Sequence, residues 1–263
     1  IQKLLARPGT IHVLVRKSSK DKFDALLAQM GFDPKRVVAV YGDLGKPRLG
    51  LSPTQVKQLA GKVKHLFHLA AIYDLTADEE SQIRANVDGT KHAMQLGVAV
   101  KAGCFHHVSS IAAAGLYPGV FKEDMFDEAE GLDDPYFRTK HDSEGMVRRE
   151  YPRPYRIYRP AIVLGHSQTG EIDKIDGPYY FFRLIKRMRA LLPQWVPTIG
   201  IEGSRLNMVP VDYVADAMDW IAHKPGLDGH CFHLTDPAPQ RVGGALNTFA
   251  GAANAPQMTM RVD

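Results

Sequence analysis

The sequence is poor in cysteine and has no long uninterrupted apolar segment. Only two cysteines, Cys104 and Cys231, occur among 263 residues, and they lack the spacing of metal ligands. Each lies in an apolar, strand-like run, so we expect buried free thiols and no metal site. No run approaches the roughly 20 apolar residues of a membrane span, and no signal peptide precedes the first predicted strand. We therefore expect a cytoplasmic protein.

The chain also lacks a strong excess of charge of one sign. Its formal net charge is +4, and the basic residues are scattered along the sequence, which argues against a nucleic-acid partner. With 44% apolar residues, the chain can bury one large core or a core with a small appended lobe.

What the sequence does contain is a regular alternation of strands and helices up to about Gly165. Because parallel strands need a crossover between them, this alternation predicts a Rossmann-type, doubly wound parallel sheet of the α/β class. The expected strands are Ile11–Val15, Val37–Tyr41, His65–Ala71, Cys104–Ser109 and Tyr155–Tyr158, and the expected helices are Lys22–Met30, Ser52–Ala60, Glu79–Lys101 and Asp134–Glu150. A helix end is expected at Ile1–Arg7.

Beyond Gly165 the alternation weakens. We place a small substrate-binding lobe there, centred on about Gly165–Gly203. Its expected elements, some of which return to the main domain, are the helix Tyr179–Leu192, the strand Leu206–Val211, the helix Asp212–His223, the strand Gly229–Thr235 and the helix Val242–Ala253.

One predicted helix carries a tyrosine and a lysine four residues apart. This spacing puts Tyr136 and Lys140 on one face. A neighbouring cation favours the phenolate, so we expect Lys140 to lower the pKa of Tyr136 and allow proton exchange with a substrate oxygen. Lysine can also donate to ribose hydroxyls. Ser110 follows an apolar strand at the carboxyl edge of the sheet, where it could hold a carbonyl oxygen beside Tyr136.

Together with these residues, six ordered segments resemble the extended short-chain dehydrogenases/reductases. The segments are His65–Ile72, Asn86–Thr90, Val108–Gly115, Tyr136–Lys140, Tyr158–Ile162 and Asn207–Tyr213. The resemblance implies that Ser110, Tyr136 and Lys140 form the catalytic set, with Asn86 in a supporting helix. Ser109 is the close alternative to Ser110 and is also a candidate cofactor contact.

Longer strings are similar to the amino-terminal reductase domain of bacterial alcohol-forming fatty acyl-CoA reductases. They include HHVSSIAAAGLYPGVFKEDMF, TGEIDKIDGPYYFF, LPQWVPTIGIEG and RLNMVPVDYVADA. This resemblance implies NADPH-dependent reduction of a long-chain acyl-CoA or aldehyde toward the alcohol. It also implies residues 1–165 as the NADP-binding domain, 166–263 as the substrate-binding lobe, and a second reductase domain in the full-length protein.

The cofactor can be predicted residue by residue. The family's first strand and glycine-rich loop are expected before Ile1 and are missing from this sequence. Arg16 and Lys17 stand where an NAD enzyme has an acidic residue, which favours the 2′-phosphate of NADPH. By resemblance, the remaining cofactor contacts are Asp43 and Leu44 at the adenine, Ala70, Ala71 and Ile72 at the middle of the cofactor, and Pro160, Ala161 and Ile162 at the nicotinamide.

Two other functions fit the same residues. One is a nucleotide-sugar epimerase or dehydratase that retains NAD, against which Arg16 and Lys17 argue. The other is a non-catalytic dinucleotide-binding regulatory protein, although such proteins often lose the tyrosine or the lysine. A basic cluster at Lys186, Arg187 and Arg189, close to aromatic residues, is compatible with a half-buried amphipathic helix, with binding of an acyl-CoA phosphate, or with a peripheral contact with an anionic membrane. His106 and His107 alternate in direction along a strand, and we expect them to be structural, without a metal.

Overall fold

The computed structural model describes residues 1–72, 78–172 and 177–262. The chain divides into two compact units. The first contains Ile1–Pro160 and Ala215–His233, and the second contains Ala161–Val214 and Leu234–Asp263. The second unit thus begins at Ala161, whereas the sequence analysis set its boundary after residue 165. In the described chain, no helix is both long and apolar enough to cross a bilayer.

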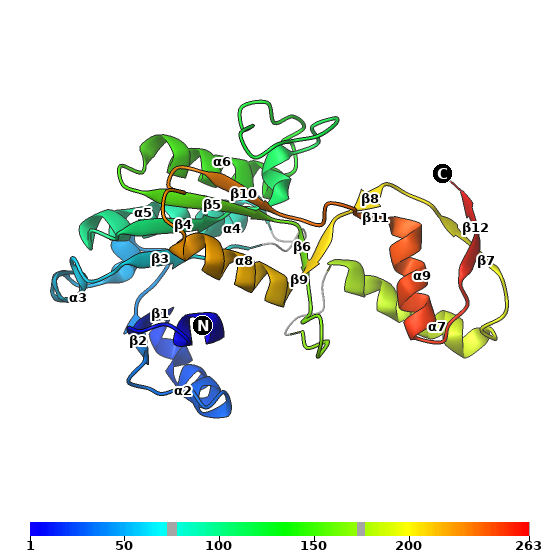
Figure 1. Cartoon of the computed structure of the whole chain (residues 1–263), viewed down its shortest axis with the longest axis horizontal. Coiled ribbons are helices and arrows are strands. Elements are labelled where there is room, and N and C mark those ends of the chain that lie inside the picture. Colours follow the sequence, from blue (N-terminus) through cyan, green and yellow to red (C-terminus); the bar gives the residue numbers. More distant parts are fainter. Residues whose placement is uncertain (73–77, 173–176, 263) are drawn as a thin grey trace. The chain divides into compact units, whose positions relative to one another are not determined.

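The first unit is built from parallel strands with helices between them (Figure 1). Strands β1 and β2 form one parallel pair. A four-stranded sheet has the order β10-β5-β4-β3, in which β3, β4 and β5 are parallel. The elements of this unit are α1 (Gln2–Leu5), β1 (Ile11–Val15), α2 (Lys20–Gln29), β2 (Val37–Tyr41), α3 (Pro53–Leu59), β3 (His65–His68), α4 (Glu79–Gln82), α5 (Gly89–Ala99), β4 (Cys104–Val108), α6 (Pro135–Glu150), β5 (Tyr155–Pro160), most of α8 (Val211–His223) and most of β10 (Cys231–Leu234).

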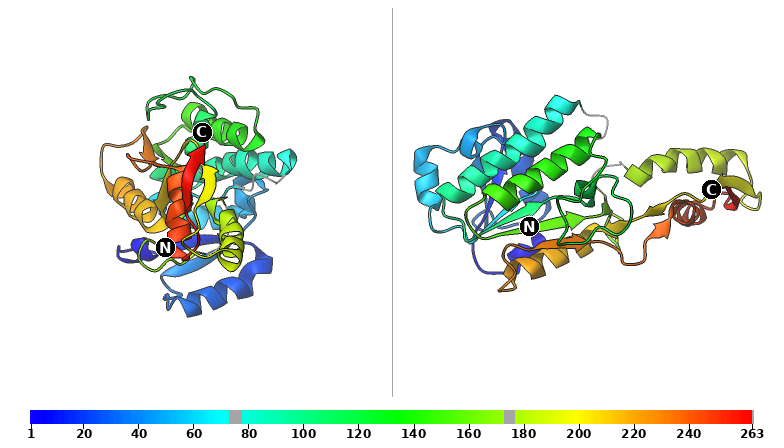
Figure 2. Two further views of the ribbon diagram at one scale, coloured as in Figure 1. Left: turned by 90° about the vertical axis from the view of Figure 1, so that its right-hand side faces the viewer. Right: turned by 90° about the horizontal axis from the view of Figure 1, so that it is seen from above.

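Helices cover both faces of the four-stranded sheet. Helices α5 and α6 lie on one face and α8 on the other (Figures 1 and 2). On the α8 side, the rings of His65 and His223 approach to 4.7 Å between centroids. This is the doubly wound arrangement, and it confirms the predicted α/β fold class.

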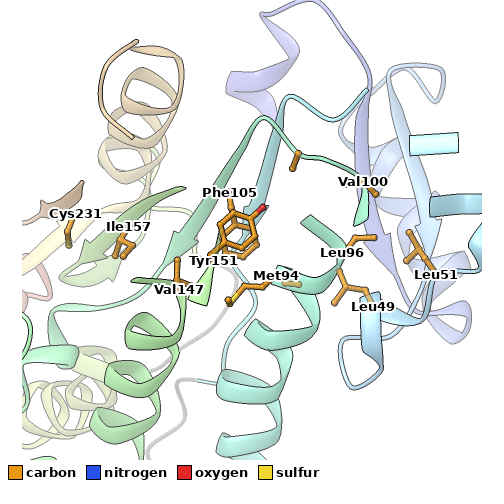
Figure 3. Packing of buried hydrophobic residues seen from close by; sticks show 12 residues of the cluster. Leu49, Leu51, Met94, Leu96, Val100, Phe105, Val147, Tyr151, Ile157 and Cys231 are labelled. Atoms are coloured by element: carbon orange, nitrogen blue, oxygen red, sulfur yellow. The ribbon is translucent and has the colours of Figure 1, made fainter. Parts of the chain in front are cut away.

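The main core fills the space between the sheet and α5 and α6. Phe105 of β4 is fully buried, and its ring lies 4.8 Å from that of Tyr151, which follows α6 (Figure 3). Gly97 of α5 is required here, because a Cβ at that position would lie 2.6 Å from the Tyr151 hydroxyl. The close approach of helix and ring therefore depends on the missing side chain.

In its described residues, the second unit consists of short strands, the helices α7 and α9, and the first turn of α8. Strand β6 pairs with β9 in parallel, β8 pairs with β11 antiparallel, and β7 pairs with β12 in parallel. The elements are β6 (Ile162–Leu164), α7 (Phe181–Leu191), β7 (Thr198–Ile201), β8 (Arg205–Leu206), β9 (Met208–Pro210), β11 (Gln240–Arg241), α9 (Val242–Ala252) and β12 (Met258–Val262).

Two predicted elements are interrupted in the structure. The helix expected over Glu79–Lys101 contains a π-helical turn, Ile83–Asp88, between α4 and α5. The strand expected over Leu206–Val211 is broken at Asn207, whose side chain bonds the backbone N–H and C=O of Asp236 at 2.9 and 2.8 Å. Its two halves, β8 and β9, therefore pair with different strands.

Candidate active site

The start of α6 is fixed by a cap and a proline. Asp134 precedes the helix, and its carboxylate accepts hydrogen bonds from the backbone N–H of Tyr136 at 2.8 Å and of Phe137 at 3.4 Å. Pro135 occupies the first helical position, where a missing N–H costs nothing. Tyr136 therefore lies in the first turn, and Lys140 lies one turn later on the same side of the helix.

Ser110 and Tyr136 are brought together by the turn that follows β4. The Tyr136 phenol lies close enough to the Ser110 side chain for that hydroxyl to influence its pKa. Ser110 Oγ also accepts the N–H of Ala112 at 3.1 Å, which fixes its position at the start of a 3₁₀ turn, Ile111–Ala114. The turn ends at Gly115 with φ +63°, where a Cβ would lie 2.0 Å from the Glu130 carbonyl oxygen. Only glycine fits at this position.

The pKa of Tyr136 is raised above its usual value. Burial is the main cause, the Ser110 hydroxyl opposes it, and the charge of Asp134 adds to it. The expectation that Lys140 lowers this pKa is therefore wrong. The reason is that desolvation of the phenol outweighs the other influences.

Lys140 is itself buried within this site. Its Nζ donates to the carbonyl oxygen of Val108, the last residue of β4, at 3.3 Å. Burial lowers the Lys140 pKa to about 8, while the charge of Glu144 acts in the opposite direction. The lysine is thus held at the carboxyl edge of the sheet with a pKa close to neutral pH.

Asn86 lies in the π-helical turn and is bound at both ends of its side-chain amide. Its Oδ1 accepts the N–H of Ile72 at 2.7 Å, and its Nδ2 donates to the Ile72 carbonyl at 3.0 Å and to Thr139 Oγ1 at 3.1 Å. Thr139 Oγ1 in turn donates to the Tyr136 carbonyl at 3.2 Å. Asn86 therefore links the segment after β3 to the first turn of α6 and acts as a positioning residue. A π-helical turn is frequent at functional sites.

A buried ion pair beside the site was missed by the sequence analysis. The carboxylate of Glu144, one turn after Lys140, accepts from Arg159 of β5 at 2.7 and 3.0 Å, and both side chains have no exposed surface. Burial raises the Glu144 pKa, but the bond and charge of Arg159, the charge of Arg148 and the Ser109 hydroxyl together lower it. The sequence feature that could have indicated this pair is the position of Glu144, four residues after Lys140 and so on the same side of the helix.

The two candidate serines therefore have different surroundings. Ser110 lies beside Tyr136, whereas Ser109 is buried on the side of Glu144, and its Oγ makes no geometric hydrogen bond among the described residues. This geometry favours Ser110 as the serine that faces a substrate. The role of either serine stays a prediction.

The histidines of β4 lie on opposite faces of the sheet. His106 Nδ1 is 2.9 Å from the Tyr158 hydroxyl and its Nε2 is 3.0 Å from His65 Nδ1, while the His107 ring stacks on that of His68 at 5.8 Å. Within the described ranges, no group of three or more His, Cys, Asp or Glu side chains is placed to hold a metal ion.

Comparison with known proteins agrees with this arrangement. A family model described as NAD_binding_4, male sterility protein, matches residues 1–218. The chain belongs to this family. The predicted resemblance to extended short-chain dehydrogenases/reductases is thereby confirmed.

Curated relatives of this family member are large proteins. The glycine betaine reductase ATRR of Emericella nidulans is 30% identical over 215 residues, which covers 78% of this chain and 16% of that protein. The L-2-aminoadipate reductase large subunit of Penicillium chrysogenum is 31% identical over 237 residues, 82% of this chain and 16% of that protein. The chain thus spans about a sixth of these two relatives.

Solved structures show the same fold. The terminal R domain from the myxalamid PKS-NRPS pathway superimposes with a TM-score of 0.79 at 25% identity, over 98% of this chain and 67% of that domain. The UDP-glucuronic acid 4-epimerase of Bacillus cereus gives a TM-score of 0.70 at 18% identity, over 99% of this chain and 81% of that one. The second likeness concerns the fold alone.

The NAD-binding family implies a bound dinucleotide. Two groups of described residues at the sheet edge are suited to parts of such a cofactor. Arg16 and Lys17 follow β1, are exposed, and have no ion-pair partner among the described side chains. Ala70 and Ala71 follow β3 and are small and at least partly exposed. A phosphate and a flat ring system can approach these two places without displacing a large side chain.

Asp43 and Leu44 are already engaged within the first unit. Asp43 Oδ1 accepts the N–H of Gly45 at 2.9 Å, the hydrogen bond of a local turn. The Leu44 side chain packs on Gly89 of α5, and the Leu44 carbonyl bonds His92 Nδ1 at 2.9 Å. Their contact with an adenine stays a prediction.

The three remaining candidates straddle the boundary between the units. Pro160 ends β5 in the first unit, whereas Ala161 and Ile162 belong to the second. There, Ala161 N–H bonds the Leu234 carbonyl at 3.0 Å, and Ile162 N–H bonds the Asn207 carbonyl at 3.2 Å. Their predicted contact with nicotinamide is untested.

Proposed function

We propose that this protein uses NADPH to reduce the carbonyl carbon of a long-chain acyl-CoA or fatty aldehyde. The neighbouring side chains of Ser110 and Tyr136 at the carboxyl edge of the sheet carry the proposal, because two hydroxyls there can share one substrate oxygen. The relatives named as reductases support the reaction type. The strings shared with fatty acyl-CoA reductases support the substrate class.

When bound, reduced nicotinamide supplies the hydride. Tyr136, whose raised pKa keeps it protonated at neutral pH, donates its proton to the substrate oxygen as charge develops there. Ser110 donates a second hydrogen bond that orients the same oxygen. Lys140, with a pKa of about 8, holds a proton one helical turn away and can return it to the phenolate.

A cavity in the second unit, lined by five apolar and three polar side chains, supports a substrate with an apolar part. Its volume is about 200 Å³, and among its lining side chains are Leu164, Leu206, Met208 and Phe249. Leu164, Leu206 and Met208 lie in or between the short strands, and Phe249 lies in α9. Part of an alkyl chain fits such a lining.

The direct test is NADPH oxidation by the full-length protein with a long-chain aldehyde and with its acyl-CoA. Tyr136→Phe should lower kcat by at least a hundredfold, the usual contribution of a positioned general acid. The matched control is Tyr155→Phe, the same change at the first residue of β5 and away from the Ser110 turn, which should leave the rate unaltered. Equal rates in wild type and Tyr136→Phe would remove the proposed role.

A second assay tests the cofactor. If Arg16 and Lys17 bind a 2′-phosphate, the double alanine variant should raise KM for NADPH about tenfold or more, the loss expected for charge-assisted hydrogen bonds, with little change for NADH. Lys35→Ala, an exposed lysine elsewhere in the first unit, is the control. A tightly held NAD released on denaturation would favour the epimerase instead.

A further inference from the structure

Helix α7 and the turn after it expose an unusual number of large apolar side chains. Leu191 is 80% and Trp195 81% exposed, and Phe181, Leu184, Leu192 and Ile199 are also exposed. Such side chains occur singly on most soluble surfaces, but here they follow one another within twenty residues. This concentration needs an explanation.

The apolar side chains of α7 share one side of the helix. Phe181, Leu184 and Leu191 are spaced by three and by seven residues, which aligns them along one stripe. The inner side is separate from this stripe. There, Ile185 is buried in a small cluster with Ala250 of α9, and the Phe182 ring meets that of Phe249 edge-on at 5.3 Å. Packing on α9 therefore leaves the stripe uncovered.

All the charged residues of this segment are basic. Residues 178–201 contain Arg183, Lys186, Arg187 and Arg189 and no acidic residue. None of these four cations forms an ion pair with a carboxylate in the part of the chain that the structure describes. Arg183 and Arg187 are one turn apart, and Arg187 lies beside the stripe next to Leu184 and Leu191.

We propose that this surface, formed by Phe181, Leu184, Leu191, Trp195, Arg183 and Arg187 and here called the α7 surface, binds an anionic lipid bilayer. An apolar stripe flanked by arginines is the pattern of a helix that lies in the membrane interface. The long arginine side chains reach lipid phosphates while their stems stay on the apolar side. Tryptophan favours the same depth, because its ring is apolar and its N–H is polar. The proposal is independent of the reaction proposed above.

The charge complementarity decides between occupants. A second copy of this chain would bring the same four cations against each other, and like charges oppose such a contact. A purely apolar ligand would leave the cations without a role. An anionic bilayer satisfies both the stripe and the charges, and each cation near its surface contributes about fivefold to binding.

The test is flotation of the purified protein with vesicles. Vesicles of phosphatidylglycerol and phosphatidylcholine in equal parts should carry the protein upward, and pure phosphatidylcholine vesicles should carry far less. Arg183→Gln with Arg187→Gln should weaken binding to anionic vesicles about 25-fold, and added salt should do the same to wild type. Leu191→Gln with Trp195→Gln should abolish it. Val120→Gln, a change at a 79% exposed valine in the first unit, is the control.

Tryptophan fluorescence gives a second readout. The chain has two tryptophans, so Trp220→Phe leaves Trp195 as the sole reporter. Its emission should shift to the blue with anionic vesicles and stay unchanged with neutral ones. Three results would overturn the proposal: no flotation with anionic vesicles, equal flotation with neutral vesicles, or a fall in oligomer mass in the Leu191/Trp195 variant without a change in vesicle binding. Circular dichroism of each variant shows whether it is folded.

Discussion

Asn86 satisfies both backbone polar groups of Ile72. Its Oδ1 accepts the Ile72 N–H at 2.7 Å and its Nδ2 donates to the Ile72 carbonyl at 3.0 Å, so one side chain holds the segment after β3 as a neighbouring strand would. Asn86 is 2% exposed. This pair of hydrogen bonds, here called the Asn86 clamp, is therefore buried, and the loss of a buried hydrogen bond lowers stability.

The first prediction concerns this clamp. Asn86→Asp keeps the acceptor but loses the donor, so the half-buried Ile72 carbonyl loses its hydrogen bond from Asn86 and the Thr139 oxygen loses the proton that it accepted. We expect a loss of about 1–3 kcal/mol in the free energy of unfolding. We also expect a lower kcat, because Thr139 connects Asn86 to Tyr136. Urea unfolding and the NADPH assay measure the two effects.

The chain offers a matched control in the second unit. Asn247 clamps Met258 in the same way, with Oδ1 accepting the N–H at 2.8 Å and Nδ2 donating to the carbonyl at 3.0 Å. Asn247→Asp should lower stability without lowering kcat through Tyr136. If both variants lose kcat to the same degree, the effect is one of folding and Asn86 has no special link to the site.

A second prediction follows from the buried Lys140. Its pKa is lowered by burial from 10.5 to about 8, so between these values the unfolded chain binds more protons than the folded one. The stability contributed by this group therefore rises with pH across that window, by about 3 kcal/mol in all. Below pH 8 the penalty of the buried ammonium is fully present.

Lys140→Met removes this titration. Urea unfolding at several pH values from 7 to 10.5 should show wild type gaining stability relative to the variant as the pH rises. The exposed Lys62→Met serves as the control, since an exposed lysine should not alter the pH dependence. Parallel curves for wild type and Lys140→Met would show that Lys140 is not desolvated.

The sequence sufficed for the fold class and for the pairing of Ser110 with Tyr136, because both depend on local periodicity and on strand ends that meet at one edge. It did not reveal the Glu144–Arg159 pair, since residues 15 positions apart on a helix and a strand meet only after packing. The raised pKa of Tyr136 could not be predicted from the sequence either. That pKa depends on how deeply the phenol is buried, and spacing along a helix carries no information on burial.

In the second unit, strands β7 and β12 were not predicted, for a different reason. Strands β7 and β12 have four and five residues and lie far apart in sequence, and their register shifts between Met258 and Met260. Short strands without clean alternation give little periodic signal.

The third prediction concerns the buried ion pair. Glu144→Gln leaves the Arg159 guanidinium in a dry site without its carboxylate, which should cost about 3–5 kcal/mol in the free energy of unfolding. Glu150→Gln at the exposed end of the same helix should cost far less. A loss in Glu144→Gln no larger than that in Glu150→Gln, measured by urea titration, would show that the pair is not desolvated.

The last prediction concerns a hydrogen-bonded chain beneath Asn86. Thr90 Oγ1 donates its single proton to the Asn86 carbonyl at 2.6 Å, so at its 3.0 Å contact with His68 Nε2 it must accept. His68, whose pKa burial lowers to about 3, is therefore neutral with its proton on Nε2. Nitrogen NMR of labelled histidine should show this tautomer at pH 7.

Thr90→Val removes the acceptor and leaves the buried His68 N–H unpaired, which should cost about 1–3 kcal/mol, while Thr90→Ser should retain most of the stability. Thr248→Val is the matched control, because Thr248 makes the same bond four residues back, to the Gly244 carbonyl at 3.1 Å, but on an exposed face. There water replaces the lost partner and the cost should be small. Two results would contradict this hydrogen-bonded series: an equal loss of unfolding free energy in the two valine variants, or a proton on His68 Nδ1. The two threonines should differ only because Thr90 is buried and accepts a hydrogen bond from His68.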